Sequence, residues 1–201
     1  MRVRLASSKC MEKNLIRPFL TDIQTIRKRA REQILCGAVT QDYDGDLDQA
    51  VKILNQALAT EIVCTLRYTA HYFLADGIHA EAVKAEFKEH AGEEREHGER
   101  IAERIKQLDG KPNFNPEGIL SRSHAEFQEG ETLADMIREN LIAERIAIET
   151  YREIIQYFGS KDPTSRRLME SILEKEEEHA DQMSDLLKTF DATKPAKSAV
   201  A

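Results

Sequence analysis

The sequence predicts an all-α fold: a four-helix bundle with one long crossover connection, an N-terminal helical extension and no fifth helix at the C-terminus. Gly and Pro are scarce, at nine and five of 201 residues, and this composition favours long helices over a turn-rich β-sandwich. Apolar residues recur at spacings of three and four along four long stretches, which is the period of one helix face. Turn-forming sequences separate the four stretches.

The first element is a basic N-terminal extension, residues 1–45, with a helix expected from about Ile16 to Leu35. The first 40 residues carry nine Lys and Arg against three Asp and Glu, a net charge of +6, whereas the rest of the chain carries 20 against 33, a net charge of −13. The basic run Arg27–Arg31 fits either the solvated face of a short helix or an arm that binds an anionic partner such as DNA.

The bundle is expected to span residues 46–190, after the acidic linker Gln41–Asp46. This linker lacks the Glu that an EF-hand calcium loop needs at its twelfth position. Each helix of the bundle carries one apolar stripe. The stripes run through Leu47, Val51, Leu54, Leu58, Thr65, Tyr68 and Tyr72, then Val83, Phe87, Ile101 and Leu108, then Ile137, Leu141, Ile148, Tyr151, Ile155 and Phe158, and finally Met169, Ile172, Met183, Leu186 and Phe190.

Breaker sequences end the first three of these helices, at Asp76–Gly77, Asp109–Pro112 and Gly159–Pro163. The connection Lys111–Gly130 is long enough to cross the bundle, and we expect a short helix within it near Ser121–Phe127. Residues 191–201 are expected to form a flexible tail, because they are too few and too Pro-interrupted for a fifth helix.

Cysteine usage and hydropathy limit the class of protein. Cys10, Cys36 and Cys64 are odd in number and lack CxxC spacing, which excludes a disulfide scaffold and a zinc ribbon and leaves reduced thiols. No apolar run approaches the roughly 20 residues of a transmembrane helix, and the N-terminus lacks the apolar segment of a secretory signal. We therefore expect a cytoplasmic protein without a membrane span.

Six polar residues occupy positions on the apolar stripes, and they form an internal repeat. They are Glu61, Glu94, His97, Glu144, Glu176 and His179. Each half of the repeat has a leading Glu, then a Glu-x-x-His motif that starts 33 residues later in the first half and 32 residues later in the second. Tyr68 and Tyr151 each lie seven residues after the leading Glu. The repeat predicts two similar halves related by a pseudo-two-fold axis.

These six residues point to a metal site. Four carboxylates in one dry core would repel one another and lose solvation, at a cost of roughly several kcal/mol per charge. Two divalent cations would cancel these charges, and Glu-x-x-His places an oxygen and a nitrogen ligand one helical turn apart. Mixed ligation of this kind suits iron, manganese or zinc rather than calcium. The pattern thus favours a di-metal site over the alternative, a hydrogen-bonded polar core.

The order Glu, Glu-x-x-His, Glu, Glu-x-x-His resembles the ligand set of ferritin-like di-iron and di-manganese carboxylate proteins. The similarity extends over about 145 residues, from Leu47 to Phe190, and is greatest to the bacterioferritin branch. The motifs that carry it are Glu61-Ile-Val-Cys-Thr-Leu-Arg-Tyr68, Glu94-Arg-Glu-His97, Gln107-Leu-Asp-Gly-Lys-Pro112 and Glu174-Lys-Glu-Glu-Glu-His179. The resemblance implies that Glu61 with His97 and Glu144 with His179 are terminal ligands of two irons, and that Glu94 and Glu176 bridge them.

Three features depart from the bacterioferritin pattern. Arg95 stands where that family carries its haem-ligating Met, so no haem is expected. The connection between the second and third bundle helices is several residues longer, and the fifth helix of large ferritin cages is missing. These features resemble Dps-like miniferritins that carry a bacterioferritin-type site within each subunit.

The resemblance implies a ferroxidase that oxidises Fe(II) with O2 or H2O2 at two iron ions per subunit, with Mn or Zn as substitutes. It further implies storage of Fe(III) in a hollow homo-oligomer, of twelve rather than 24 subunits, as protection against oxidative stress. One alternative is a rubrerythrin-like di-iron peroxidase, although this sequence has no CxxC pair of the kind found in the electron-transfer domain of that family. The other alternative is a DNA-binding or structural shell protein.

Other polar residues near the stripes have less certain roles. His90 lies one turn from Glu94 and fits an extra ligand, a proton carrier or a hydrogen-bonded core histidine. Cys64 lies one turn from Glu61 and fits a redox partner or a small buried hydrophobe. Tyr68 and Tyr151 are expected to hydrogen-bond the ligands or donate an electron. Four acidic residues lie off the stripe and are expected to be solvated or to attract iron at the surface: Glu93, Glu96, Glu99 and Glu103. Three histidines lack a readable partner pattern: His71, His79 and His124.

Overall fold

A computed structural model of the chain describes residues 21–32, 34, 37–78 and 80–192. The chain divides after Cys36 into two compact units. In the first unit, the Asp22 side chain accepts hydrogen bonds from two backbone N–H groups and starts helix α1, Ile23–Arg29. Helix α1 buries none of its residues, so no packing stabilises a longer helix. It is therefore shorter than the helix predicted from Ile16 to Leu35, although parts of that range lie outside the described residues.

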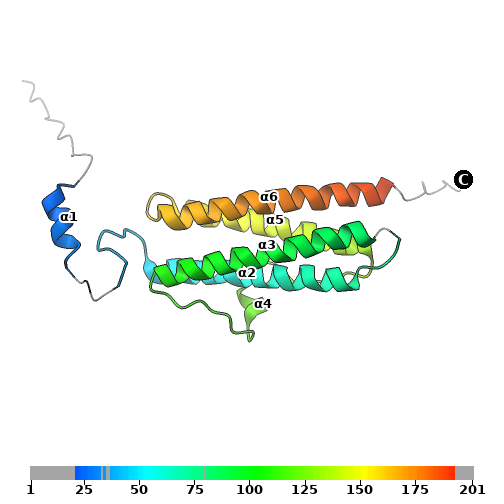
Figure 1. The fold of residues 1–201 in the computed structure, drawn as a ribbon, viewed down its shortest axis with the longest axis horizontal. Helices are drawn as coiled ribbons and strands as arrows, with labels where there is room; N and C mark the ends of the chain where they lie inside the picture. The colour runs from blue at the N-terminus through cyan, green and yellow to red at the C-terminus, as the bar shows by residue number, and fades with distance from the viewer. Residues whose placement is uncertain (1–20, 33, 35–36, 79, 193–201) are drawn as a thin grey trace, which may run out of the picture. The chain divides into compact units, whose positions relative to one another are not determined.

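The second unit contains the predicted four-helix bundle, which is confirmed (Figure 1). Its helices are α2, Leu47–Leu74, α3, Ala80–Gln107, α5, Leu133–Phe158, and α6, Pro163–Ala192. Helix α2 packs along α3, and α5 packs along α6, so the bundle consists of two helical hairpins. Contacts between α2 and α5 and between α3 and α6 join these hairpins. The described residues include no β-strand, and none of the helices they form is long and apolar enough to span a membrane.

The ends of the bundle helices follow the breaker residues. Asp46 caps α2 by accepting a hydrogen bond from the backbone N–H of Gln49, at 3.0 Å. After α3, Asp109 adopts a left-handed conformation with φ 60°, and Gly110 follows. A Cβ on Gly110 would lie 2.6 Å from Val51 of α2, so only glycine allows this close return of the chain. The flexible tail was expected at residues 191–201, but α6 continues through Ala192, and residues 193–201 lie outside the described part of the chain.

The crossover between the hairpins contains one short helix, α4, Ile119–Arg122. The prediction expected a short helix near Ser121–Phe127; the observed helix overlaps this range only at Ser121 and Arg122, and it starts and ends earlier. The helix ends early because Ser123 is extended and the next backbone N–H, that of His124, donates to Thr60 Oγ1 on α2 at 3.0 Å. Binding to α2 thus replaces further helical turns in this segment.

A buried arginine fastens the crossover to the bundle. Arg67 of α2 is 1% exposed, and its Nε donates to Asn140 Oδ1 of α5 at 2.9 Å. Its Nη1 donates to the backbone carbonyl of Glu126 at 3.0 Å. One turn later, His71 Nε2 lies 2.9 Å from the carbonyl oxygen of Gln128. The crossover is therefore held in place by side chains of α2.

The core of the bundle has two large apolar clusters with a polar layer between them, and a third, small cluster of Cys64, Ala125 and Ala143. One cluster includes Leu54 and Leu58 of α2 and Ile101 of α3. The other includes Phe87 of α3 and Met183 of α6. Along every bundle helix the residues of the two clusters lie on opposite sides of the polar stripe positions. This arrangement places the six polar residues of the repeat in one layer with apolar packing above and below.

Candidate metal centre

All six predicted ligand residues are buried in the polar layer. Their side chains come from all four bundle helices, and none of the six is more than 3% exposed: Glu61, Glu94, His97, Glu144, Glu176 and His179. The helical period accounts for this convergence, since a spacing of three residues places Glu94 and His97 on one face of α3, and Glu176 and His179 on one face of α6.

The six residues form two overlapping groups of four. Within each group, one potential ligand atom per residue lies within 4.8 Å of those of the other members. The first group contains Glu61 and His97, and the second contains Glu144 and His179. Glu94 and Glu176 belong to both groups. The geometry thus offers two adjacent cation positions that share two carboxylates.

The histidine rings direct the same nitrogen, Nδ1, toward the shared carboxylates. His97 Nδ1 lies 3.0 Å from Glu176 Oε1 and 3.4 Å from Glu94 Oε2. His179 Nδ1 lies 3.5 Å from Glu94 Oε1 and 3.7 Å from Glu176 Oε2. Both histidines therefore contact both shared glutamates, as two adjacent positions require.

Unpaired buried atoms test whether the residues fit metal ions. Among the described residues, each of the six has at least one buried side-chain atom without a hydrogen-bond partner. Both carboxylate oxygens of Glu94 and the Nδ1 atoms of His97 and His179 are among these atoms. Buried polar atoms are normally paired, because an unpaired one costs about 1–3 kcal/mol. A donor set of carboxylate oxygens and imidazole nitrogens left unpaired in this way fits iron, manganese or zinc.

Two tyrosines connect the halves of the site. Tyr68 of α2 donates a short hydrogen bond to Glu144 Oε1 of α5, and Tyr151 of α5 donates one to Glu61 Oε1 of α2. Each tyrosine therefore fixes the leading Glu of the opposite half and leaves its second oxygen, Oε2, unpaired. The prediction that these tyrosines hydrogen-bond the ligands is confirmed in the geometry.

In the metal-free protein, protons bound to the side chains of the polar layer offset part of the negative charge of its carboxylates. Burial, together with the neighbouring charges of the two shared glutamates, raises the pKa of Glu61 and of Glu144 well above the ordinary range. Burial also acts to raise the pKa of Glu94, but contacts with His179 and His97 outweigh it and lower that pKa. The surrounding carboxylates overcome burial at both histidines and raise the pKa of His97 and of His179 to about 12. Metal binding must therefore displace protons from this layer.

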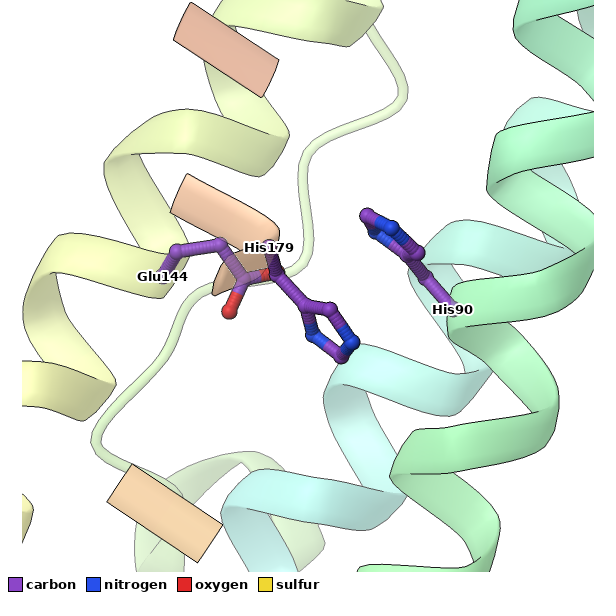
Figure 2. Close-up of side chains that lie close together, drawn as sticks. All are labelled: His90, Glu144 and His179. Atoms are coloured by element: carbon purple, nitrogen blue, oxygen red, sulfur yellow. The ribbon is translucent and has the colours of Figure 1, made fainter. Parts of the chain in front are cut away.

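His90 and Cys64 lie beside the six residues. The His90 ring lies beside that of His179 (Figure 2) and stacks on it with centroids 4.0 Å apart. The Nε2 atom of His90 lies 2.8 Å from Gln182 Oε1. It is thus a buried, hydrogen-bonded histidine next to the site, and with Glu144 and His179 it forms a third group of close ligand atoms. Cys64 is buried, and burial raises the pKa of its thiol well above the ordinary range, so it remains a protonated thiol.

Glu93 was expected to be solvated or to attract iron at the surface, but it is only partly exposed and contacts the site. Its Oε2 lies 2.6 Å from His179 Nε2 on α6, and its side chain is only 33% exposed. No spacing pattern signals this contact, because Glu93 lies off the stripe of α3 and its partner comes from another helix. Three of the other acidic residues of that face are exposed as expected: Glu96, Glu99 and Glu103.

Two of the remaining histidines, His71 and His124, contact residues outside the polar layer. His71 binds the crossover backbone, as described above, and His124 Nδ1 lies 3.2 Å from Thr60 Oγ1. His79 lies outside the described residues. Both described contacts attach the crossover to α2.

Comparisons with known proteins agree with this fold and site. The family profile described as a ferritin-like domain matches residues 51–193. The DNA protection during starvation protein of Pyrococcus furiosus is 32% identical over 145 residues, which cover 71% of this chain and 78% of that protein. A bacterioferritin of Mycobacterium tuberculosis is 29% identical over 148 residues, covering 73% and 88%.

A solved structure extends this agreement. The dodecameric thioferritin of Bacteroides fragilis, a bacterioferritin-related protein, superposes with a TM-score of 0.70 at 30% identity and covers 73% of this chain and 89% of its own. The match to the family profile begins in the first turns of α2 and includes the rest of the bundle, with all six residues of the polar layer. The chain therefore belongs to the family of ferritin-like domains, with relatives named bacterioferritin and DNA protection during starvation protein.

Proposed function

We propose that this protein is a ferroxidase that binds two Fe(II) ions per chain at the six residues of the polar layer and oxidises them with O2 or H2O2. One observation carries the proposal: two groups of four buried ligand residues overlap at Glu94 and Glu176, and each of the six residues has a buried side-chain atom without a hydrogen bond. The names of the relatives, bacterioferritin and DNA protection during starvation protein, support an iron-storage role at the level of the family.

Bound iron supplies the redox chemistry, and the chain supplies a fixed, anionic, dry environment for it. Glu61 and His97 would hold one ion, Glu144 and His179 the other, and the shared glutamates both. Carboxylate oxygens are hard ligands that favour Fe(III) over Fe(II), and they also accept Mn(II) or Zn(II) as substitutes. The apolar clusters on both sides keep bulk water from the layer, and the two tyrosines hold the leading glutamates in place.

Anaerobic titration with Fe(II), followed by addition of O2 or H2O2, tests the proposal. We expect saturation at two Fe(II) per chain and oxidation of both ions, measured by the ultraviolet absorbance of the Fe(III) product. Saturation far from two would contradict it. Turnover of peroxide with an external reductant and without iron mineral would indicate a rubrerythrin-like peroxidase instead. Metal-dependent stability without oxidation would indicate a structural shell.

We propose that the protein assembles into a hollow homo-oligomer of twelve subunits, rather than 24, in which oxidised iron is stored. Storage needs an enclosed volume, since free Fe(III) precipitates, and the net charge of −13 on residues 41–201 would attract cations. The relative from Bacteroides fragilis is named as dodecameric. Native mass measurement should give about twelve chains, and a dimer would remove the storage role.

The basic N-terminal extension is proposed to bind DNA phosphates without sequence preference. Helix α1 carries three basic residues in its last turn, Arg27, Lys28 and Arg29, and a relative is named for DNA protection. Replacing these three residues by Gln should weaken DNA retardation in gel-shift assays and flatten its salt dependence, by about 0.9 in the logarithmic slope per lost phosphate contact. Equal retardation of both proteins would count against the arm.

We also propose that the protein binds no haem. Arg95 is an exposed residue of α3 that forms an ion pair with Glu99, at 3.9 Å, and its guanidinium cannot replace a thioether ligand. Reconstitution with haem should give no stoichiometric Soret band.

A further inference from the structure

In the internal repeat, the predicted ligands of one half have equivalent residues in the other half. The residues that contact these ligands differ between the two halves. Glu94 and Glu176, and likewise His97 and His179, lie 82 positions apart on α3 and α6. At the same offset, Glu93 corresponds to Lys175. His90 corresponds to Ile172, a fully buried residue of the apolar cluster. The two candidate metal positions therefore have similar ligands and different surroundings.

At the position formed by Glu144 and His179, a carboxylate contacts the ring nitrogen of the histidine that faces away from the other ligands. Glu93 Oε2 lies 2.6 Å from His179 Nε2, so this nitrogen donates its proton to the carboxylate. The opposite ring nitrogen, Nδ1, is buried and has no hydrogen-bond partner. The other oxygen of Glu93 lies 3.7 Å from Lys175 Nζ, which keeps the carboxylate oriented. A carboxylate in this place fixes the ring and increases the basicity of the nitrogen that faces a metal.

A second contact holds the face of the same ring. The His90 and His179 rings are stacked, with an angle of 19° between their planes (Figure 2). His90 itself is held by Gln182 of α6 and by an edge-on contact with Tyr68, with ring centroids 5.1 Å apart. His179 is therefore restrained by a carboxylate at its edge and by an aromatic ring on its face.

In the described part of the chain, His97, the histidine of the other position, has neither a carboxylate partner at Nε2 nor a closely stacked ring. Within the described ranges, no residue accepts a hydrogen bond from Nε2 of His97, and the repeat places Lys175, which has no acceptor atom, where a carboxylate would be needed. The nearest stacked ring partner of His97 is His179 itself, with centroids 6.2 Å apart. His97 thus has more freedom to turn away from its carboxylates.

We propose that Glu93 and His90 are positioning residues that make the two metal positions unequal. The position formed by Glu144 and His179 holds its ion tightly, as a resident ion. The position formed by Glu61 and His97 binds more weakly and exchanges its ion. This inference rests on the proposed two-ion site and specifies which ion stays and which is turned over.

Anaerobic titration with Co(II), followed by its visible absorption, tests the inference without iron oxidation. The wild-type protein should bind two Co(II) per chain in two resolved steps. Replacing Glu93→Leu should weaken only the first step, by about 10- to 100-fold, as loss of such a hydrogen-bond partner typically does. Glu93→Gln keeps an acceptor without the charge and should restore part of this loss. His90→Ile, which copies the other half of the repeat, should bring the two steps closer together.

The matched control is Glu96→Leu, because Glu96 is an exposed residue on the same helix. It should leave both steps unchanged. Equal affinities for the two ions in the wild-type protein, or equal weakening of both steps by Glu93→Leu, would overturn the inference while leaving the two-ion site intact. Binding of fewer than two ions by the wild-type protein would overturn the proposed function and the inference with it.

Discussion

Replacing both shared glutamates, as Glu94→Ala plus Glu176→Ala, should abolish two-ion binding and slow iron oxidation at least about 100-fold. Each of these residues belongs to both groups of potential ligands, so the double variant removes half of the four side chains at each position. Loss of a hydrogen-bond partner behind a ligand alone costs about 10- to 100-fold in metal affinity or activity, and loss of two shared ligands costs more. Stopped-flow measurement of Fe(III) formation, with metal analysis of the protein, provides the readout.

The matched control replaces two exposed glutamates of the same helices, as Glu96→Ala plus Glu174→Ala. These substitutions remove the same number of carboxylates from α3 and α6 and leave the polar layer unchanged. The control should oxidise iron at the wild-type rate. If Glu94→Ala plus Glu176→Ala also oxidises iron at that rate, the polar layer is not the ferroxidase site.

Metal binding should raise the stability of the protein by about 5 kcal/mol. An ion that binds only the folded state contributes about 2.7 kcal/mol when its free concentration is 100 times its Kd, so two ions contribute about twice that amount. For a chain of this size, the increase corresponds to a rise of roughly 10–20 °C in the melting temperature. Calorimetry of the metal-free protein with and without Zn(II), which is not oxidised, measures the effect.

The variant Glu94→Ala plus Glu176→Ala serves again as the comparison. Its melting temperature should not respond to Zn(II), because the shared ligands are gone. Its metal-free form should melt below the metal-free wild type, because the two substitutions remove the carboxylates that contact His97 and His179 in the buried layer. An equal response of both proteins to Zn(II) would locate the stabilising ions elsewhere.

The sequence was sufficient to predict the bundle and the convergence of the six polar residues. Helix period and breaker residues are local properties, and a residue such as Glu144 on an apolar stripe must face the core. The predicted ends of helices were less accurate where contacts between distant parts of the chain determine the end of a helix. Helix α4 ends early because the chain turns to bind Thr60 of α2, and this contact joins residues 64 positions apart.

The residues that sequence patterns missed are those whose partners come from another element. Arg67 is almost fully buried, although arginine is normally a surface residue, because Asn140 and a carbonyl of the crossover bind its guanidinium. Glu93 lies outside the apolar stripe and still contacts His179 across the helix interface. Neither contact has a period or motif from which it could be inferred.

The division of the ligands between the two helical hairpins has a consequence for the order of folding. Each group of four takes three side chains from one hairpin and one shared glutamate from the other. The hairpins are built from local contacts and should form early, whereas the ligand layer closes only when they dock across the crossover. Metal would then bind after the folding transition state. Bound ions should therefore leave the folding rate nearly unchanged, and almost all of the stability that they add should appear as slower unfolding.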